Sequence, residues 1–249
     1  MANQLTDKKF WTAYWESKPD LALSVGPHYL FHKQLKSVIR QNHLKSAIEL
    51  GGFPGYYAVF LKKYFGIEPT LFDYFIHRDI LQQVLEKNGL GKTDVDVIEA
   101  DLFQYKPTRY YDLVLSCGLI EHFLDTKDVI KRHVQFLNPS GVLLITLPNF
   151  KSINGWIQKV FDRESYEKHH IACMDLELLA SICHELGLKN VRVEYINRFS
   201  VWLENKNEKP FWVNMFVKTV WYLGKIVTKL IPFESKFLSP YILVQAQKD

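Results

Sequence analysis

Three acidic residues stand at the ends of predicted strands and could together bind a nucleoside. Glu49, Asp73 and Asp101 each close a short apolar run of the kind that forms a buried strand. An ionised carboxylate offers two acceptor oxygens, so the second acid can accept hydrogen bonds from both ribose hydroxyls. Leu102 and Phe103 add an apolar wall that suits an adenine ring. One such acid alone is ordinarily a helix cap or a solvated loop residue, but three at successive strand ends favour a nucleoside site.

A glycine-rich turn follows the first of these strands. It reads GGFPG over 51–55 and departs from the dinucleotide pattern G-x-G-x-x-G, because Phe53 and Tyr56 hold the second and third glycine positions. From the glycines alone, the turn could equally be a plain tight connection. A nicotinamide cofactor stays open as the competing ligand of Asp73.

The elements that would position these residues alternate along the chain from residue 46. Apolar runs predict strands over 46–51, 68–74, 95–102, 111–117, 142–149, 190–197 and 240–247. A helical period predicts helices from Gly55 and over 77–88, 125–137 and 175–186. Such alternation builds a mostly parallel sheet with helices on both faces. We therefore predict an α/β fold, a Rossmann-like, doubly wound sheet of seven strands with the last strand antiparallel.

The composition excludes several classes of protein. With 249 residues, 47% of them apolar, and a net charge of +4, the chain can form a large core and has no basic tail for nucleic acid. Cys117, Cys173 and Cys183 lack metal-ligand spacing and argue for reduced thiols. The N-terminus lacks an apolar signal segment, and no apolar run is long enough to span a membrane. We therefore expect a cytoplasmic protein without a nucleic-acid partner.

Two additions accompany the predicted domain of residues 46–249. Residues 1–45 carry predicted helices over about 7–17 and 27–41, and we assign them as an N-terminal helical lid. The second addition is a largely helical insertion at about 199–239, which is too long for a simple hairpin loop. These additions should shape the acceptor pocket, but neither matches a motif that identifies an acceptor.

Aromatic residues crowd the first predicted helix. The spacing of Trp11, Tyr14 and Trp15 favours a helix face that packs into the core. The alternative is a lid that covers a reacting centre, since aromatic rings can hold a cation and exclude water.

The segment 209–231 combines a wide apolar stripe with lysines and contains no acid. The interpretation favoured here is that the stripe packs on the sheet or the substrate cleft, or forms a homodimer contact. The alternative is contact with a membrane surface or a lipid substrate, because an apolar face beside lysines is typical of interfacial helices. Three internal lysines and Asn214 argue against a membrane span.

Five stretches resemble the class I S-adenosylmethionine-dependent methyltransferases, in particular the group that acts on small molecules and glycans. They read IELGGFPG at 48–55, LFDY at 71–74, IEADLF at 98–103, YDLVLSCGLIEHFLD at 111–125 and LNPSGVLLITLPN at 137–149. The last two are the most specific, because an aliphatic-Glu-His run after the fourth strand and a Pro-x-Gly turn into the fifth recur in that group. The chain departs from the family at Phe53, where the first motif usually has its middle glycine.

The resemblance implies S-adenosyl-L-methionine as the cofactor and a set of residues around it. By position they are Glu49, Gly51, Gly52 and Gly55 at its amino-acid end, Asp73 at the ribose with Tyr74 next to it, Asp101 and Leu102 at the adenine, and Ser116 and Cys117 behind the sulfonium.

Methyl transfer to a poorly acidic hydroxyl gains from a general base, and histidines are the candidates. His122 is the first choice because it follows Glu121 directly after the fourth strand, although a structural histidine is an equal alternative. His170, next to His169, and His28 are the others, but the charged segment around the pair favours a solvated loop. Adjacent Glu121 and His122 rarely form a cation site alone and no third carboxylate is evident, so we predict no metal.

The residues and the resemblance together predict methyl transfer to a small-molecule acceptor, a hydroxyl of a sugar or glycan precursor. A quinone-like or lipid-linked acceptor is the alternative that the apolar insertion favours. A binding module that keeps the cofactor pocket without turnover is the other alternative, which Phe53 and the lack of an unambiguous base support.

Overall fold

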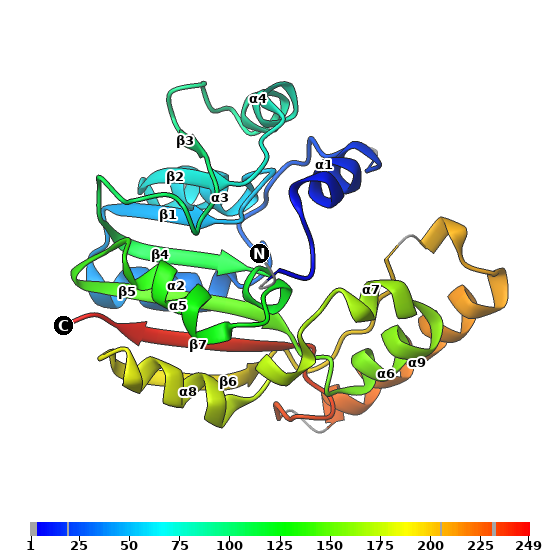
Figure 1. The fold of residues 1–249 in the computed structure, drawn as a ribbon. Coiled ribbons are helices and arrows are strands. Elements are labelled where there is room, and N and C mark those ends of the chain that lie inside the picture. The colour runs from blue at the N-terminus through cyan, green and yellow to red at the C-terminus, as the bar shows by residue number, and fades with distance from the viewer. Residues whose placement is uncertain (1–3, 19, 205, 231–232) are drawn as a thin grey trace.

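The computed structural model describes residues 4–18, 20–204, 206–230 and 233–249, and its centre is one seven-stranded sheet (Figure 1). The strands lie in the order β3-β2-β1-β4-β5-β7-β6. Their bounds are β1 Ser46–Leu50, β2 Glu68–Asp73, β3 Asp96–Glu99, β4 Tyr111–Cys117, β5 Leu137–Pro148, β6 Lys189–Ile196 and β7 Tyr241–Gln247. β1 to β5 are parallel, whereas β7 runs antiparallel to both β5 and β6. The predicted doubly wound α/β fold with an antiparallel last strand is confirmed.

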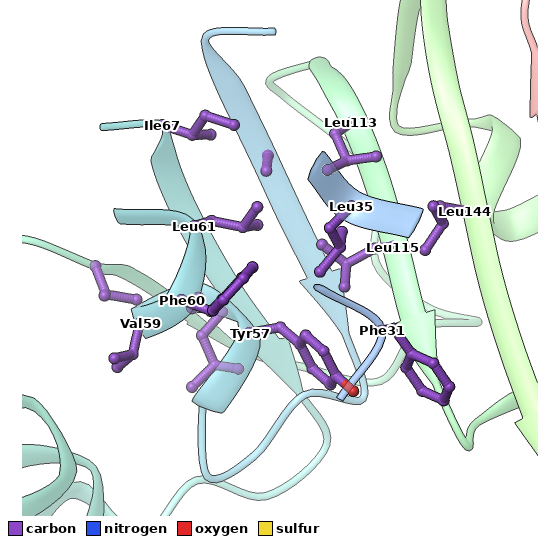
Figure 2. Close-up of a cluster of buried hydrophobic side chains, with 14 of the residues drawn as sticks. Phe31, Leu35, Tyr57, Val59, Phe60, Leu61, Ile67, Leu113, Leu115 and Leu144 are labelled. Carbon is purple, nitrogen blue, oxygen red and sulfur yellow. The ribbon is translucent and has the colours of Figure 1, made fainter. Parts of the chain in front are cut away.

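Helices cover both faces of the sheet. Their bounds are α1 Lys8–Glu16, α2 His32–Asn42, α3 Tyr56–Phe65, α4 Arg78–Lys87, α5 Thr126–Val134, α6 Ile153–Phe161, α7 Arg163–Glu167, α8 Leu176–Glu185 and α9 Phe211–Leu230. Side chains of α2, α3 and α4 bury one face, and those of α5 and α8 bury the other. Along β4 the two-residue period of a strand sends Leu113 and Leu115 to the first face and Val114 to the second. Figure 2 shows the first face, where Leu35 of α2 lies beside Leu113 and Leu115.

Several elements differ from the prediction. Strand β3, expected over 95–102, ends at Glu99, so Asp101 lies two residues beyond it. The helix expected over 27–41 begins only at His32, because Phe31 before it has a left-handed φ of 63°. Strand β5 begins at Leu137, which pairs with Tyr111 of β4, so the expected turn over 138–141 forms an irregular part of the strand instead. The segment after β5 folds into α6 and α7, which the sequence did not predict.

The N-terminal region divides between the core and the edge of the sheet. Leu35 and Val38 of α2 are fully buried, so α2 belongs to the helical layer and not to a lid. Helix α1 has no buried residue. In Figure 1, α1 lies on the side to which β4 points, at the carboxyl end of the sheet. Within the described part of 1–45, Gln4, Thr6 and α1 lie at this edge of the sheet; residues 1–3 and 19 lie outside the described part.

The insertion forms a small platform with the segment after β5. Ile157 of α6, Phe199, Val201 and Leu203, together with α9, make a third hydrophobic cluster separate from those on the sheet. The helix predicted over 209–231 is confirmed as α9, with Ile231 outside the described residues. Within the described part of the chain, no helix has the length and apolar character needed to cross a membrane.

Candidate active site

The turn after β1 is packed too tightly for side chains. Gly51 has a left-handed φ of 63°, and a Cβ there would lie 2.7 Å from a methyl carbon of Leu119. A Cβ on Gly52 would overlap the side chain of Glu49. Glu49 itself accepts a hydrogen bond from the Ala58 N–H at 2.8 Å, and burial raises its pKa to about 8. Glu49 therefore lies beneath the turn and fastens it to α3.

Asp73 and Asp101 fix the loops that follow β2 and β3. Asp73 accepts the N–H of Phe53 on Oδ2 at 2.9 Å and the N–H of Phe75 on Oδ1 at 3.1 Å. Burial raises its pKa to about 6, and these two N–H groups oppose the rise. Asp101 accepts from Phe103 N–H at 2.8 Å and from Gln104 Nε2 at 3.0 Å. Each carboxylate oxygen keeps a second lone pair, so both acids can still accept a hydrogen bond from a ligand.

A cavity opens beside these acids at the carboxyl ends of the strands, and we call it the strand-end cavity. It brings together Gly51, Asp73, Tyr74, Asp101 and Leu102 of the predicted cofactor residues. Its other lining residues are Gln4, Thr6, Trp11, Trp15, Phe72, Ala100, Gly118, Leu119, His122 and Phe123. This lining combines acceptor oxygens with apolar walls, as is expected of a nucleoside site.

A second cavity of about 300 Å³ adjoins the first, and we call it the aromatic cavity. Its ring-bearing residues come from distant segments of the chain: Phe10, Trp11, Tyr14, Trp15, Phe53, Phe150, Trp202 and Tyr241, with His122 and His169. Polar groups among them include Glu121, Lys168 and Glu204. The cavity is therefore mostly apolar with a few polar groups, as is usual for a site that binds a small molecule.

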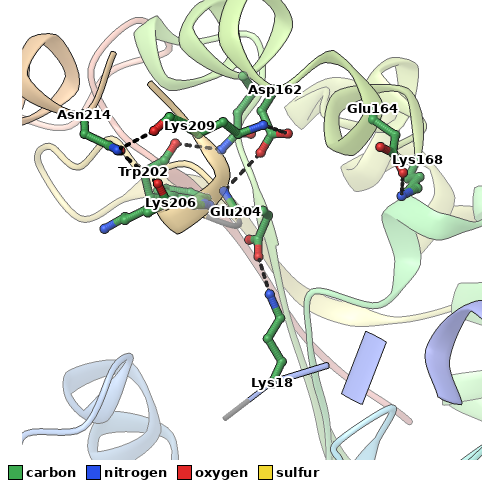
Figure 3. Close-up of polar contacts among 10 residues, drawn as sticks. Lys18, Asp162, Glu164, Lys168, Trp202, Glu204, Lys206, Lys209 and Asn214 are labelled. Atoms are coloured by element: carbon green, nitrogen blue, oxygen red, sulfur yellow. Dashed lines mark hydrogen bonds and ion pairs between the residues drawn. The ribbon is translucent and has the colours of Figure 1, made fainter. Parts of the chain in front are cut away.

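Helix α1 covers both cavities. The ring of Trp11 meets that of His122 edge to face at 5.0 Å, and the ring of Trp15 meets Phe53 at 5.3 Å. The Tyr14 hydroxyl donates to Glu204 at 3.2 Å. Lys18 pairs with the same carboxylate at 3.5 Å, as Figure 3 shows. The two interpretations of these aromatic residues are therefore not exclusive, because Trp15 packs against the hydrophobic core while Trp11 and Trp15 also line both cavities.

Glu121, His122 and His169 gather at the junction of the cavities. Their potential ligand or acceptor atoms all lie within 4.8 Å of one another. Nδ1 of His122 donates to the Lys168 carbonyl at 2.9 Å and Nδ1 of His169 to the Ser165 carbonyl at 2.7 Å, which leaves each Nε2 as an acceptor. Burial lowers the pKa of His122 to about 3 and raises that of Glu121 to about 8. Burial also lowers the pKa of His169, so all three side chains are mostly neutral near pH 7.

The structure brings some of the predicted site residues to the two cavities and places others elsewhere. Cys117 lines the aromatic cavity, but the Ser116 hydroxyl is fully buried on the opposite face of β4, where it bonds to His133 at 2.9 Å. His28 is exposed and contacts His32, and His170 bonds to the Phe123 carbonyl outside both cavities. Of the three histidine candidates, only His122 lies between the two cavities.

The aromatic cavity also holds residues for which the sequence predicted no site role or another environment, among them His169, Trp202 and Glu204. His169 was expected in a solvated loop, but its ring lies 4.8 Å from that of His122 and 4.7 Å from that of Phe150. Trp202 and Glu204 come from the insertion, which carries no recognisable motif. The histidine pair is a candidate base from its residue type, but its charged segment suggests a solvated environment.

A larger cleft lies elsewhere, between α2, β6 and α9. Its volume is about 1080 Å³, but none of the strand-end acids or cavity histidines lines it. Its walls carry Lys33, Arg198 and Lys225, among other charged groups. The groups suited to catalysis therefore meet in the two smaller cavities.

Comparison with known proteins places this geometry in a family. Residues 27–193 match the family described as a methyltransferase domain. No curated protein matches the chain in sequence. The matched residues include β1 to β5, whose carboxyl ends lie at the two cavities, and the first part of β6.

Similar folds occur in solved methyltransferases. Phosphoethanolamine N-methyltransferase 2 of Haemonchus contortus, solved with S-adenosyl-L-methionine, has a TM-score of 0.59 at 17% identity, and the match covers 87% of this chain and 52% of that one. The present chain thus spans about half the length of that enzyme. A putative sarcosine dimethylglycine methyltransferase of Galdieria sulphuraria has a TM-score of 0.58 at 18% identity, with 97% of both chains covered. A possible histamine N-methyltransferase of Thermotoga maritima has a TM-score of 0.55 at 14% identity, again with 97% of both chains covered.

At these identities the solved structures establish the fold, while the family match covers more than half of the sequence. The resemblance derived from the sequence motifs is thereby confirmed. The chain belongs to the methyltransferase-domain family and has the class I fold of S-adenosylmethionine-dependent methyltransferases.

Proposed function

We propose that this methyltransferase transfers a methyl group from S-adenosylmethionine to a small acceptor held in the aromatic cavity. One observation carries the proposal: Trp11, Trp15, Gly51, Gly118 and His122 line both cavities, so the two are contiguous. In-line displacement at a methyl carbon requires that donor and acceptor be held close and aligned. Two adjoining cavities of different chemistry meet that requirement.

The groups that line the strand-end cavity suit S-adenosylmethionine, although the cavity's volume of about 70 Å³ requires its cover to move before the whole cofactor can enter. Asp73 would accept from the ribose hydroxyls, and Asp101 with Leu102 would receive the adenine. The rings of Trp11 and Trp15 would lie near the sulfonium, which a π face stabilises. The cofactor carries no phosphate and so does not require a full cradle of backbone N–H groups at the turn. When bound, it supplies a methyl group that is already activated for displacement.

The titratable cluster at the junction is the proposed proton acceptor. His122 is neutral, and its Nδ1 is held by the Lys168 carbonyl, so its Nε2 can take the proton of an attacking hydroxyl. His169 lies in ring contact with His122 and can orient it or pass the proton on. Because burial makes His122 a weak base, alignment would supply the larger part of the rate enhancement.

The acceptor that we propose is a hydroxyl of a sugar or glycan precursor. The lining supports a molecule with flat apolar faces and several hydroxyls, because Trp202 and Phe150 stand beside Glu204 and Lys168. The amine-directed names of the solved neighbours make amines the first competitors to test.

Two other functions have specific support. A lipid-linked or quinone-like acceptor is favoured by the exposed apolar side chains of α9, which belongs to the same platform as Trp202. A binding module without turnover is favoured by Phe53, which is buried in the turn and donates its N–H to Asp73.

Calorimetry with S-adenosylmethionine and S-adenosylhomocysteine, run beside a methylation assay, separates these functions. The assay would present pools of nucleotide sugars, oligosaccharides, quinols, lipid-linked sugars and amines. We expect binding of both cofactor forms and a methylated product from the sugar pool. Binding without any product would favour the module, product from another pool would reassign the acceptor, and absence of binding would refute every version of the proposal.

A further inference from the structure

Helices α6 and α9 expose a continuous apolar surface, which we call the α6–α9 face. Trp212, Leu223 and Leu230 of α9 are 63%, 58% and 77% exposed, and Trp156 of α6 is 53% exposed. The ring of Phe216 contacts that of Trp156 at 6.4 Å, so the two helices share one surface. Most of the large apolar side chains that the described residues leave exposed lie on these helices or just after α9. Such a concentration usually marks a binding surface.

The exposed and buried residues of α9 follow the helical period. Val213, Val217 and Thr228 face the platform core and are buried. Trp212, Phe216, Leu223, Val227 and Leu230 recur at the spacing of a second stripe, and they are exposed. The helix therefore has more apolar surface than its own core can cover.

Lysines border the apolar stripe, and neither helix carries an acid. Lys218, Lys225 and Lys229 recur at i, i+7 and i+11 and so lie along one side of α9, while α6 contributes Lys159. Lys225 and Lys229 also line the neighbouring cleft, together with the basic Lys33 and Arg198 and the acidic Glu194 and Glu234. Lys225 donates to the Phe199 carbonyl at 2.7 Å. The surface is thus apolar, aromatic and locally cationic.

We propose that the α6–α9 face binds the surface of a membrane that contains anionic lipids. An apolar helix face with Trp, Tyr and flanking lysines matches the boundary between acyl chains and anionic headgroups. A second copy of the chain fits less well, because two such faces would oppose their lysines without a carboxylate on either helix to pair with them. Helix α9 lies flat in this mode and does not cross the bilayer, in accord with its lysines.

Hydrogen bonds tie this face to the aromatic cavity. Gln158 of α6 donates to the Trp202 carbonyl at 2.8 Å. Asp162, just after α6, accepts from the Glu204 N–H at 3.1 Å and from Lys209 at 2.7 Å (Figure 3). Docking would therefore hold a wall of the cavity near the membrane, where a lipid-linked acceptor could reach it. That consequence rests on the proposed function, whereas the docking does not.

Sedimentation of the full chain with vesicles tests the docking without any turnover. We expect binding to phosphatidylcholine vesicles that contain phosphatidylglycerol, weakened by salt, and weaker binding to pure phosphatidylcholine. Trp212→Ser with Leu223→Ser should lower the partition at least about tenfold, because both side chains leave the apolar stripe. Lys218→Glu with Lys229→Glu should lower binding to the anionic vesicles by at least about tenfold.

A control pair of substitutions distinguishes the effect of charge on the α6–α9 face from the effect of the protein's net charge. Lys36→Glu with Lys87→Glu makes the same change in net charge on exposed positions of α2 and α4 and should bind as the wild type does. All of the variants change exposed side chains, and circular dichroism would check that they fold. The proposal is overturned if the wild type does not sediment, or if the α9 variants sediment like the control pair. It is also overturned if light scattering shows a dimer that Trp212→Ser with Leu223→Ser converts to monomers.

Discussion

The strand-end cavity and the aromatic cavity are built in different ways. The first takes Gly51, Asp73 and Asp101 from positions at or just beyond the ends of neighbouring strands, so the fold itself gathers them. The second joins α1, the segment after β4, α7 and the insertion. Its Tyr14–Glu204 hydrogen bond spans 190 positions of the sequence. The strand-end cavity is therefore formed by the sheet, whereas the aromatic cavity is formed largely by the segments that surround the sheet.

This difference implies that cofactor binding and acceptor turnover can be changed separately. The two cavities share Trp11 and His122 at their junction, but the acids of the strand-end cavity do not line the aromatic one. Substitutions on each side should affect one property and spare the other.

The largest effect is expected from His122→Ala. If the acceptor is a hydroxyl of high pKa, loss of the base should lower kcat by at least about 10²-fold. Cofactor affinity should stay near that of the wild type, because the imidazole acts on the nucleophile and not on the sulfonium. Steady-state kinetics and calorimetry measure the two properties.

His28→Ala is the matched control for this substitution. His28 is exposed and lies in neither cavity, so its removal should leave kcat unchanged. If His122→Ala kept full turnover, alignment alone would suffice for catalysis. If it lost cofactor binding as well, His122 would be a structural residue.

A smaller effect is expected from Asp73→Ala. Leaving the ribose hydroxyls without a charged acceptor should weaken cofactor binding by about 1–3 kcal/mol. The variant should fold but lose some stability, because the N–H groups of Phe53 and Phe75 lose their acceptor. Calorimetry on protein shown to be folded by circular dichroism gives the measurement. Unchanged affinity would mean that the end of β2 does not bind the ribose.

The sequence predicted the strand-end cavity far better than the aromatic one, and the reason is physical. Carboxyl ends of parallel strands meet at one edge, so Asp73 and Asp101 could be placed together once the strands were recognised. Ser116 was misplaced although it follows the same logic, because the period of a strand sends it to the face opposite Cys117.

No local pattern could have placed the residues of the aromatic cavity. The spacing of Trp11 and Trp15 is the same for a core helix and for a cover, and only tertiary contacts distinguish them. His169 reaches His122 through the fold of α7, whose sequence is polar and charged. Such positions depend on long-range packing, which a single sequence does not encode in any local period.

A more modest effect should come from pH, through Asp73. Burial raises its pKa to about 6, so below that pH the carboxylate takes up a proton and loses acceptor capacity for the ribose. Cofactor affinity should then fall by up to about tenfold for each pH unit below the pKa. Asp73→Asn keeps the shape without the titration, and its weaker affinity should be flat over the same interval. An equal fall in Asp73→Asn would assign the pH dependence to another group.

The smallest effect is expected from metal chelation. Glu121, His122 and His169 are side chains of metal-binding types, and the fold brings His169 to the other two although it lies 47 positions after His122 in the sequence. Even so, displacement at a sulfonium methyl needs alignment and a proton acceptor, and its leaving group requires no Lewis acid. Treatment with EDTA or phenanthroline should therefore leave kcat unchanged within error. The opposite result would be a loss of turnover that added zinc or manganese restores in the wild type but not in His169→Ala. It would show that the cluster holds a metal ion and that coordination, instead of a base, activates the acceptor hydroxyl.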